Sequence, residues 1–206
     1  NPLTPIKLNI QFLQRTNPSS VENYQEILDR VSHTIIEQID NLSNIATEFS
    51  NFAKIPKAKN ERFNLIDRLE EIISLFDYAG ECSIDRKFKG AEGIEIFADK
   101  EQFSRAVINL VRNAIQSIPE NRVGKITVSA KPEKGAVIVS VADNGKGISP
   151  EMEENIFVPN FTTKTSGTGL GLAITKGIVE NFRGEIWFSS ELNTGTTFYI
   201  RIPMVK

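Results

Sequence analysis

Apolar residues recur every three or four positions in the first quarter of the chain, and this spacing predicts two helices. The first is expected over residues 3–13. The second runs from Ser19 to Pro56, and its apolar stripe consists of Leu28, Val31, Ile35, Ile39, Leu42, Ile45, Phe49 and Phe52. Ser19 and Glu22 have the spacing of a capping box, and the intervening "TNPSS" is typical of a turn. The pattern predicts an antiparallel helical hairpin.

One hairpin cannot cover both of its apolar stripes. Because the stripe of the second helix is close to a heptad repeat, we expect two copies to pair into a four-helix bundle. Packing of the hairpin onto the rest of its own chain is the alternative, which the polar stretch "KIPKAKNER" makes less favoured because it resembles a linker. The expected organisation is a hairpin over residues 1–55, a linker over 56–63 and a second domain over 64–206.

The second domain mixes helical and strand patterns. Amphipathic helices are expected at 64–76, capped by Asn64, and at 100–118, ended by Pro119. Alternating residues predict two β-hairpins, formed by 125–132 with 136–143 and by 184–191 with 196–203. The fold class is therefore α+β, and the second domain is expected to be a two-layer α/β sandwich with helices on one face of a mostly antiparallel sheet.

Composition excludes several classes of protein. The 206 residues are 40% hydrophobic and 24% charged, with a net charge of −2, which does not suggest nucleic-acid binding. The single cysteine, Cys82, excludes an internal disulfide. No apolar run approaches the ~20 residues of a membrane span, and no signal peptide opens the chain. We expect a soluble, cytoplasmic domain.

The segment "ADNGKGISPE" at 142–151 is the first candidate for chemistry. Its Asn-Gly pair usually marks a hairpin turn, but no strand follows, and the Ser-Pro pair is typical of a helix start. Asp143 would then end a core strand at the floor of a cleft, where its carboxylate accepts a hydrogen bond from an amine. Gly145 and Gly147 would leave room for a flat ligand.

Three glycines precede the next amphipathic helix, at positions 167, 169 and 171. Amide groups exposed at a helix N-terminus bind phosphate, because unpaired donors and the helix dipole both face the anion. The spacing is not that of a dinucleotide fold, and a flexible loop with a helix cap is the alternative.

Asn109 and Asn113 lie four residues apart on the helix expected at 100–118, so both amides project from one edge. A buried asparagine usually satisfies a neighbouring backbone group. An amide oxygen together with nucleotide phosphates and water would alternatively complete the shell of a Mg²⁺ ion.

Taken together, Asn109 with Asn113, "DNGKG", "IFVPNFTTK" and "GTGLGL" resemble the four sequence boxes of the GHKL superfamily of ATP-binding domains, which have the Bergerat fold. Within it, residues 64–206 are similar to the catalytic domain of two-component sensor histidine kinases. "DKEQFSRAVINLVRNAIQS" is similar to that family's pattern along its whole length.

The resemblance implies ATP and Mg²⁺ as cofactors and assigns roles. Asp143 recognises the adenine amine, Asn113 is the metal ligand, and Asn109 and Lys164 act at the phosphates. Lys is frequent in the family where this chain has Gln116, so one cationic phosphate contact is expected to be missing. The remaining residues implied to shape the nucleotide site or its lid are Gly145, Gly147, Ile148, Phe157, Phe161, Thr162, Thr163, Gly167, Thr168, Gly169, Leu170, Gly171, Leu172 and Thr196 (or Thr197).

The family's first hairpin helix carries His-Glu-x-x-Asn-Pro, where the histidine accepts the phosphoryl group. "NPL" at 1–3 resembles the end of that box, and the longer stretch "NPLTPIKL" at 1–8 resembles nitrogen-regulation sensors of the NtrY kind. The acceptor is therefore expected four places before Asn1, and this chain is not expected to phosphorylate itself. His33, off the apolar stripe, is expected to be a solvated helix residue.

The resemblance also implies partners: a second copy of the chain and a response regulator, whose aspartate receives the phosphoryl group. Nucleic acid is not expected, and the inner membrane is expected to be reached only through upstream segments. Hydrolases of the superfamily have Glu where Asn109 stands, and an amide cannot take a proton from water, which favours a kinase. A GHKL-type protein serine kinase and a nucleotide-binding module without transfer activity are the alternatives.

Overall fold

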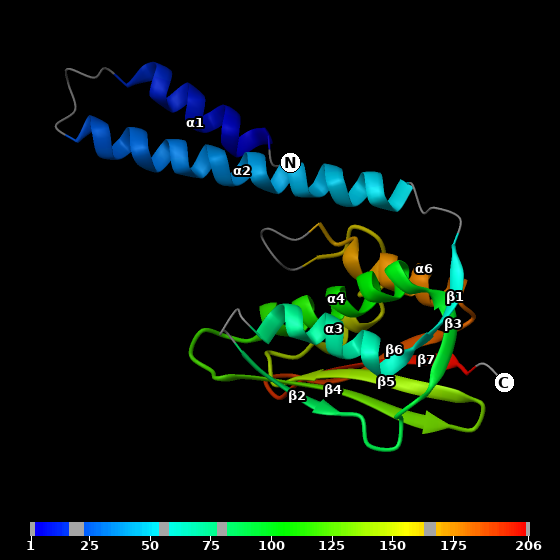
Figure 1. The fold of residues 1–206 in the computed structure, drawn as a ribbon. Coiled ribbons are helices and arrows are strands. Elements are labelled where there is room, and N and C mark those ends of the chain that lie inside the picture. The colour runs from blue at the N-terminus through cyan, green and yellow to red at the C-terminus, as the bar shows by residue number, and fades with distance from the viewer. Residues whose placement is uncertain (1–2, 17–22, 54–57, 78–81, 163–167, 205–206) are drawn as a thin grey trace. The chain divides into compact units, whose positions relative to one another are not determined.

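The computed structural model describes residues 3–16, 23–53, 58–77, 82–162 and 168–204. The chain forms two compact units, the first built on residues 1–54 and the second comprising residues 55–163 and 169–206. In the first unit, α1 (Leu3–Arg15) packs along α2 (Tyr24–Ala53) (Figure 1). Both predicted helices are confirmed. The predicted capping box and turn, and Pro56, lie largely outside the described residues.

The helical pair leaves much of its apolar surface in solvent. Val31 of the α2 stripe is buried, but Leu3 and Ile10 of the α1 stripe and Ile39 of the α2 stripe are each between 43% and 58% exposed. A single hairpin therefore does not cover its own stripes, as the pattern of the sequence predicted.

The second unit is a five-stranded sheet with helices on one face (Figure 1). Its strand order is β2 (Cys82–Lys87), β4 (Gly124–Glu133), β5 (Ala136–Asp143), β7 (Gly195–Pro203) and β6 (Glu185–Glu191). The pair β2–β4 is parallel and the other three pairs are antiparallel. The covering helices are α3 (Leu65–Asp77), α4 (Lys100–Ser117) and α6 (Gly171–Asn181), and α5 (Pro150–Glu153) is a single short turn. Both predicted β-hairpins and the two-layer sandwich are confirmed.

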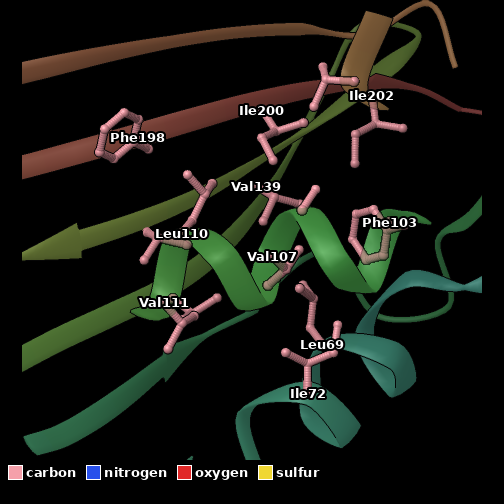
Figure 2. Packing of buried hydrophobic residues seen from close by; sticks show 14 of the residues in the cluster. Leu69, Ile72, Phe103, Val107, Leu110, Val111, Val139, Phe198, Ile200 and Ile202 are labelled. Atoms are coloured by element: carbon pink, nitrogen blue, oxygen red, sulfur yellow. The ribbon is translucent and has the colours of Figure 1, made fainter. Parts of the chain in front are cut away.

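The core lies between the helices and the sheet. Figure 2 shows α4 at its centre, with Phe103, Val107 and Leu110 close to the side chains of β5 and β7. Leu69 and Ile72 of α3 pack on the other side of the same helix. Each such side chain contributes about 1.5–3 kcal/mol by leaving water. Seven of the 18 residues of α4 are buried, and apart from Ser104 its polar residues are half-buried or exposed.

Side-chain caps set where the two long helices of this unit begin. The Asn64 carboxamide oxygen accepts hydrogen bonds from the amides of Ile66 and Asp67, so Asn64 caps α3 as predicted. Asp99 caps α4, with Oδ1 accepting from the amides of two first-turn residues at 3.1 and 2.9 Å. The Asp99 cap therefore fixes the residue at which α4 begins.

The prediction that residues 56–63 form a linker is wrong at its C-terminal end. Residues Asn60–Asn64 form strand β1, which pairs antiparallel with β3 (Glu95–Asp99) in a separate two-stranded ribbon. Phe63 is buried, whereas Asn60, Glu61 and Arg62 are exposed. A strand in an exposed ribbon can form with a single buried apolar residue. The alternation of apolar and polar residues by which a strand is recognised in a sequence is therefore absent from β1.

Candidate functional site

The exposed edge of α4 carries three polar residues at four-residue intervals: Asn109, Asn113 and Ser117. All three are half-buried, with buried Leu110, Val111 and Ala114 between them. Asn109 Nδ2 donates a hydrogen bond of 2.9 Å to Thr175 Oγ1 of α6, which fixes the orientation of its amide. The sequence predicted both asparagines at one edge, and the helix that brings them there is confirmed.

Asp143, the last residue of β5, lies at the C-terminal end of α4. Its Oδ1 accepts hydrogen bonds from the Gly145 amide at 2.8 Å, from the Thr196 amide at 3.3 Å and from Ser117 Oγ at 3.0 Å, whose one hydrogen is shared with the Ala114 carbonyl oxygen at 2.8 Å. Three donors from three segments converge on one oxygen, so the carboxylate plane is held in a defined orientation. The predicted position of Asp143 at the end of a strand is confirmed, and its acceptance of a hydrogen bond from an amine stays a prediction.

Gly145 and Gly147 are required by the protein's own packing. A Cβ at residue 145 would collide with the Ser117 hydroxyl, and one at residue 147 would collide with the Glu191 carbonyl. Gly147 also has φ of 71°, which favours glycine. The explanation that these glycines only leave room for a flat ligand is therefore incomplete, because protein atoms occupy the space next to them.

The segment before α6 brings a second backbone element to Asn109. Gly169 has φ of 68°, and a Cβ there would lie within 2.7 Å of the Phe161 backbone. Gly171 begins α6, and a Cβ on it would lie 2.5 Å from Asn109 Oδ1. The first turn of an α-helix has amides without intrahelical acceptors. A helix N-terminus thus lies directly against an amide side chain, which is a geometry suited to an anion.

Further predicted residues pack around these elements. The Ile148 amide donates to Ser190 Oγ at 2.8 Å, and Ser190 Oγ lies 2.8 Å from the hydroxyl of buried Thr196. Phe157 packs edge-on against Phe198 at 6.4 Å between ring centroids. Leu170 is buried, and Phe161 and Leu172 are half-buried against the core.

Some predicted residues are not placed at the site. Thr163, Lys164 and Gly167 lie outside the described residues, so the predicted role of Lys164 stays a prediction. Thr162 and Gln116 are exposed, and Thr168 is half-buried. Sequence reasoning did not identify Ser117, Thr175 or Ser190. Ser117 could have been found, because it follows Asn109 by eight residues and so lies on the same edge of the helix.

The donor set fits ATP and a hard cation. Gly147 and Gly169 have positive φ, and the first residue of α6, Gly171, lies against the Asn109 side-chain amide. In the described part of the chain, no group of three His, Cys, Asp or Glu side chains could hold a metal. A magnesium ion would therefore depend on amide oxygens such as that of Asn113 together with phosphate and water. Among the same residues, no helix has the length and apolar character needed to cross a membrane.

Residues 98–206 match the model of the histidine kinase-, DNA gyrase B- and HSP90-like ATPases. The chain belongs to this family. It is 30% identical over 207 residues to sporulation kinase B of Bacillus subtilis, covering 98% of this chain and 46% of that protein. It is 32% identical over 213 residues to the nitrogen regulation protein NtrY of Azorhizobium caulinodans, covering 99% of this chain and 27% of that protein. The chain thus spans less than half the length of these curated relatives.

Solved structures of histidine kinases are similar to this chain in fold and in sequence. The catalytic domain of the histidine kinase ThkA is 36% identical with a TM-score of 0.64, covering 70% of this chain and 95% of that one. ThkA in complex with its response regulator TrrA is 27% identical with a TM-score of 0.73, covering 100% of this chain and 58% of that one. Within its family, the chain therefore carries the catalytic domain of a sensor histidine kinase, as the sequence boxes indicated.

Proposed function

We propose that this chain is the ATP-binding portion of a sensor histidine kinase, which transfers the γ-phosphoryl group of ATP to a histidine and then to an aspartate of a response regulator. The observation that carries the proposal is the arrangement along α4. A carboxylate oriented by three donors lies at one end of the polar edge, and an amide against a helix N-terminus lies toward the other. These two ends are suited to the adenine and the phosphates of one nucleotide.

On the adenine side, Asp143 accepts a hydrogen bond from the exocyclic amine. Three donors hold its Oδ1, so the carboxylate keeps its orientation before the base binds, and little conformational entropy is lost on binding. Guanine presents a carbonyl oxygen at the corresponding position, which a carboxylate repels. The site should therefore discriminate ATP from GTP.

On the phosphate side, Asn109 and the first turn of α6 face the anion, and Asn113 supplies an oxygen for Mg²⁺. The metal neutralises phosphate charge when bound. Asn109 cannot act as a base, because its amide does not accept a proton near neutral pH. The chain therefore holds ATP without activating water, which suits transfer to a nucleophile from another domain.

We infer that two copies associate through α1 and α2, because six large apolar residues in the described part of these helices are more than 40% exposed: Leu3, Leu8, Ile10, Phe12, Ile36 and Ile39. A response regulator as acceptor is supported by the ThkA complex with TrrA. We further propose a cytoplasmic location. The chain's one histidine, His33, has a side chain that is 78% exposed on α2, with Nε2 3.6 Å from the Glu37 carboxylate, and we infer that it is a solvated helix residue and not the acceptor.

The test uses calorimetry with Mg-ATP, followed by incubation with labelled ATP and a separate hairpin that contains a His-Glu-x-x-Asn-Pro box. ATP should bind, and acid-labile phosphate should appear on the added hairpin and not on the chain itself. Asp143→Asn should lose at least about tenfold in ATP affinity, the size of one lost specific hydrogen bond. The control Asp85→Asn, on exposed β2, should bind normally. Absence of ATP binding by the unmodified chain, or acid-stable phosphoserine on a partner, would refute the proposal.

A further inference from the structure

Arg122 lies in the loop between α4 and β4, outside every motif that identified the family. Its Nη1 donates hydrogen bonds to the main-chain oxygens of Asn144 and Gly145, at 2.5 and 2.9 Å. The side chain is half-buried, and the Arg122 amide donates to the Pro119 oxygen at 2.9 Å, which closes the loop that holds it. An invariably charged group therefore contacts the backbone directly after Asp143.

The contact to Asn144 has a particular consequence, because a peptide group is planar. The carbonyl oxygen of Asn144 and the amide of Gly145 belong to the same peptide. The oxygen accepts from Arg122, and the amide donates to Asp143 Oδ1 at 2.8 Å. The guanidinium, this peptide and the carboxylate thus form one hydrogen-bonded chain, in which each bond polarises the next.

If the guanidinium were absent, the peptide group between Asn144 and Gly145 could rotate. Gly145 follows it, and glycine permits backbone conformations that other residues do not. The Asn144 side chain is fixed separately, because Nδ2 donates to the Val123 oxygen and Oδ1 accepts from the Lys125 amide. These bonds hold the side chain of Asn144 to the start of β4. They do not set the direction of the Gly145 amide.

We propose that Arg122 is a positioning residue for base recognition: through the 144–145 peptide it orients Asp143, and so it sets the preference of the site for adenine over guanine. This inference rests on the proposed role of Asp143 in ATP binding. The contribution of Arg122 to nucleotide affinity should come through the base and not through the phosphates. Both of its hydrogen-bond acceptors lie next to Asp143 in the chain, and neither is on α6.

The experiment compares the full chain with Arg122→Ala, Arg122→Lys and Arg201→Ala, measuring the affinities of Mg-ATP and Mg-GTP by calorimetry. Arg201 is the matched control, since its Nε pairs with Glu133 at 2.9 Å and its strand position faces Ile138, near the opposite end of β5 from Asp143. Arg122→Ala should lower the ratio of ATP to GTP affinity about tenfold, the equivalent of one charge-assisted hydrogen bond. Arg122→Lys should restore part of the ratio, and Arg201→Ala should leave it unchanged.

The affinity ratio separates positioning from loss of structure, because unfolding part of the sample lowers the competent fraction equally for both nucleotides. An unchanged ratio in Arg122→Ala would overturn the inference even if both affinities fell. A second readout needs no nucleotide. The amide resonance of Gly145 should shift upfield in Arg122→Ala as its bond to Asp143 weakens, and an unmoved resonance would also overturn the inference. Failure of the unmodified chain to bind ATP would instead refute the proposed function.

Discussion

Replacing Gly171 with alanine should separate nucleotide binding from folding. The added Cβ would lie 2.5 Å from Asn109 Oδ1 and 3.1 Å from Asn109 Cγ and Nδ2, whereas apolar atoms pack best at about 3.5–4 Å. Asn109 must therefore move by about 1 Å, and its hydrogen bond to Thr175 is lost at a cost of about 1 kcal/mol. Alanine offsets up to about 1 kcal/mol through its higher helix propensity, so the free energy of unfolding should change little.

Function should respond much more strongly than stability. A displacement of about 1 Å in a group that positions a reacting phosphate costs about 100-fold in rate. Gly177 provides the control within the same helix, because a Cβ there would meet no atom within 4 Å. Gly177→Ala should stabilise the protein by about 0.5–1 kcal/mol without altering ATP binding.

The assays are urea unfolding of both variants, calorimetry with Mg-ATP, and phosphoryl transfer to a hairpin that contains the acceptor histidine. If Gly171→Ala binds ATP and transfers phosphate as well as Gly177→Ala, Asn109 does not act at the phosphates and the reasoning fails. If Gly171→Ala is unfolded, the Asn109 side chain is too tightly held to move, and Asn109→Ala should then be compared with Gly177→Ala in its place.

Three other changes test the fold and its assembly. Asp99→Ala removes acceptors for the Lys59 amide and for two amides of the first turn of α4, and it should lower the free energy of unfolding in urea by about 1–2 kcal/mol. The hydrogen bond from Arg68 lowers the pKa of Glu71 below its ordinary value, so the contribution of this pair to stability is present above the ordinary pKa and is lost as the pH falls through the lowered pKa. Glu71→Gln and the unmodified chain should therefore differ slightly in melting temperature near neutral pH and converge in acid. Ile39→Asp, at an apolar position that is 52% exposed, should yield monomers in sedimentation experiments at concentrations where the unmodified chain is dimeric.

Helices and strands whose apolar residues recur at regular intervals were predictable from the sequence. Helix α4 has seven buried residues at helical spacing, and in β4 and β5 buried and less buried residues alternate on either side of a short turn. For each of these segments, one type of secondary structure buries the apolar residues much better than any other. The placement of the asparagines at 109 and 113 on one edge followed from the same period, because residues four apart lie on the same side of a helix. Prediction worked where a local pattern and the tertiary environment agree.

Strands β1, β2 and β3 were not predicted, and the reason is tertiary. β2 pairs in parallel with β4 at the sheet edge, and most of its six residues are exposed. Their extended conformation depends on the partner strand and not on their own apolar pattern. The hydroxyl of Thr175 was missed for a similar reason, because its partner Asn109 is 66 residues away. The positions of such contacts depend on how α4 and α6 are packed.

The contact of Thr175 also explains why an amide, and not a carboxylate, suits position 109. The Thr175 hydroxyl has one hydrogen, which it donates to the Gly171 carbonyl at 3.0 Å. In this orientation it accepts from residue 109, and Asn109 Nδ2 supplies the donor. A carboxylate has no hydrogen to donate, so the Thr175 hydroxyl would have to turn from the Gly171 carbonyl to reach it, at a cost of about 0.5–1.5 kcal/mol, the net value of one hydrogen bond. The residue that would activate water is thus disfavoured by the packing of α6 itself, and the chemistry of the site is coupled to the helix that closes it.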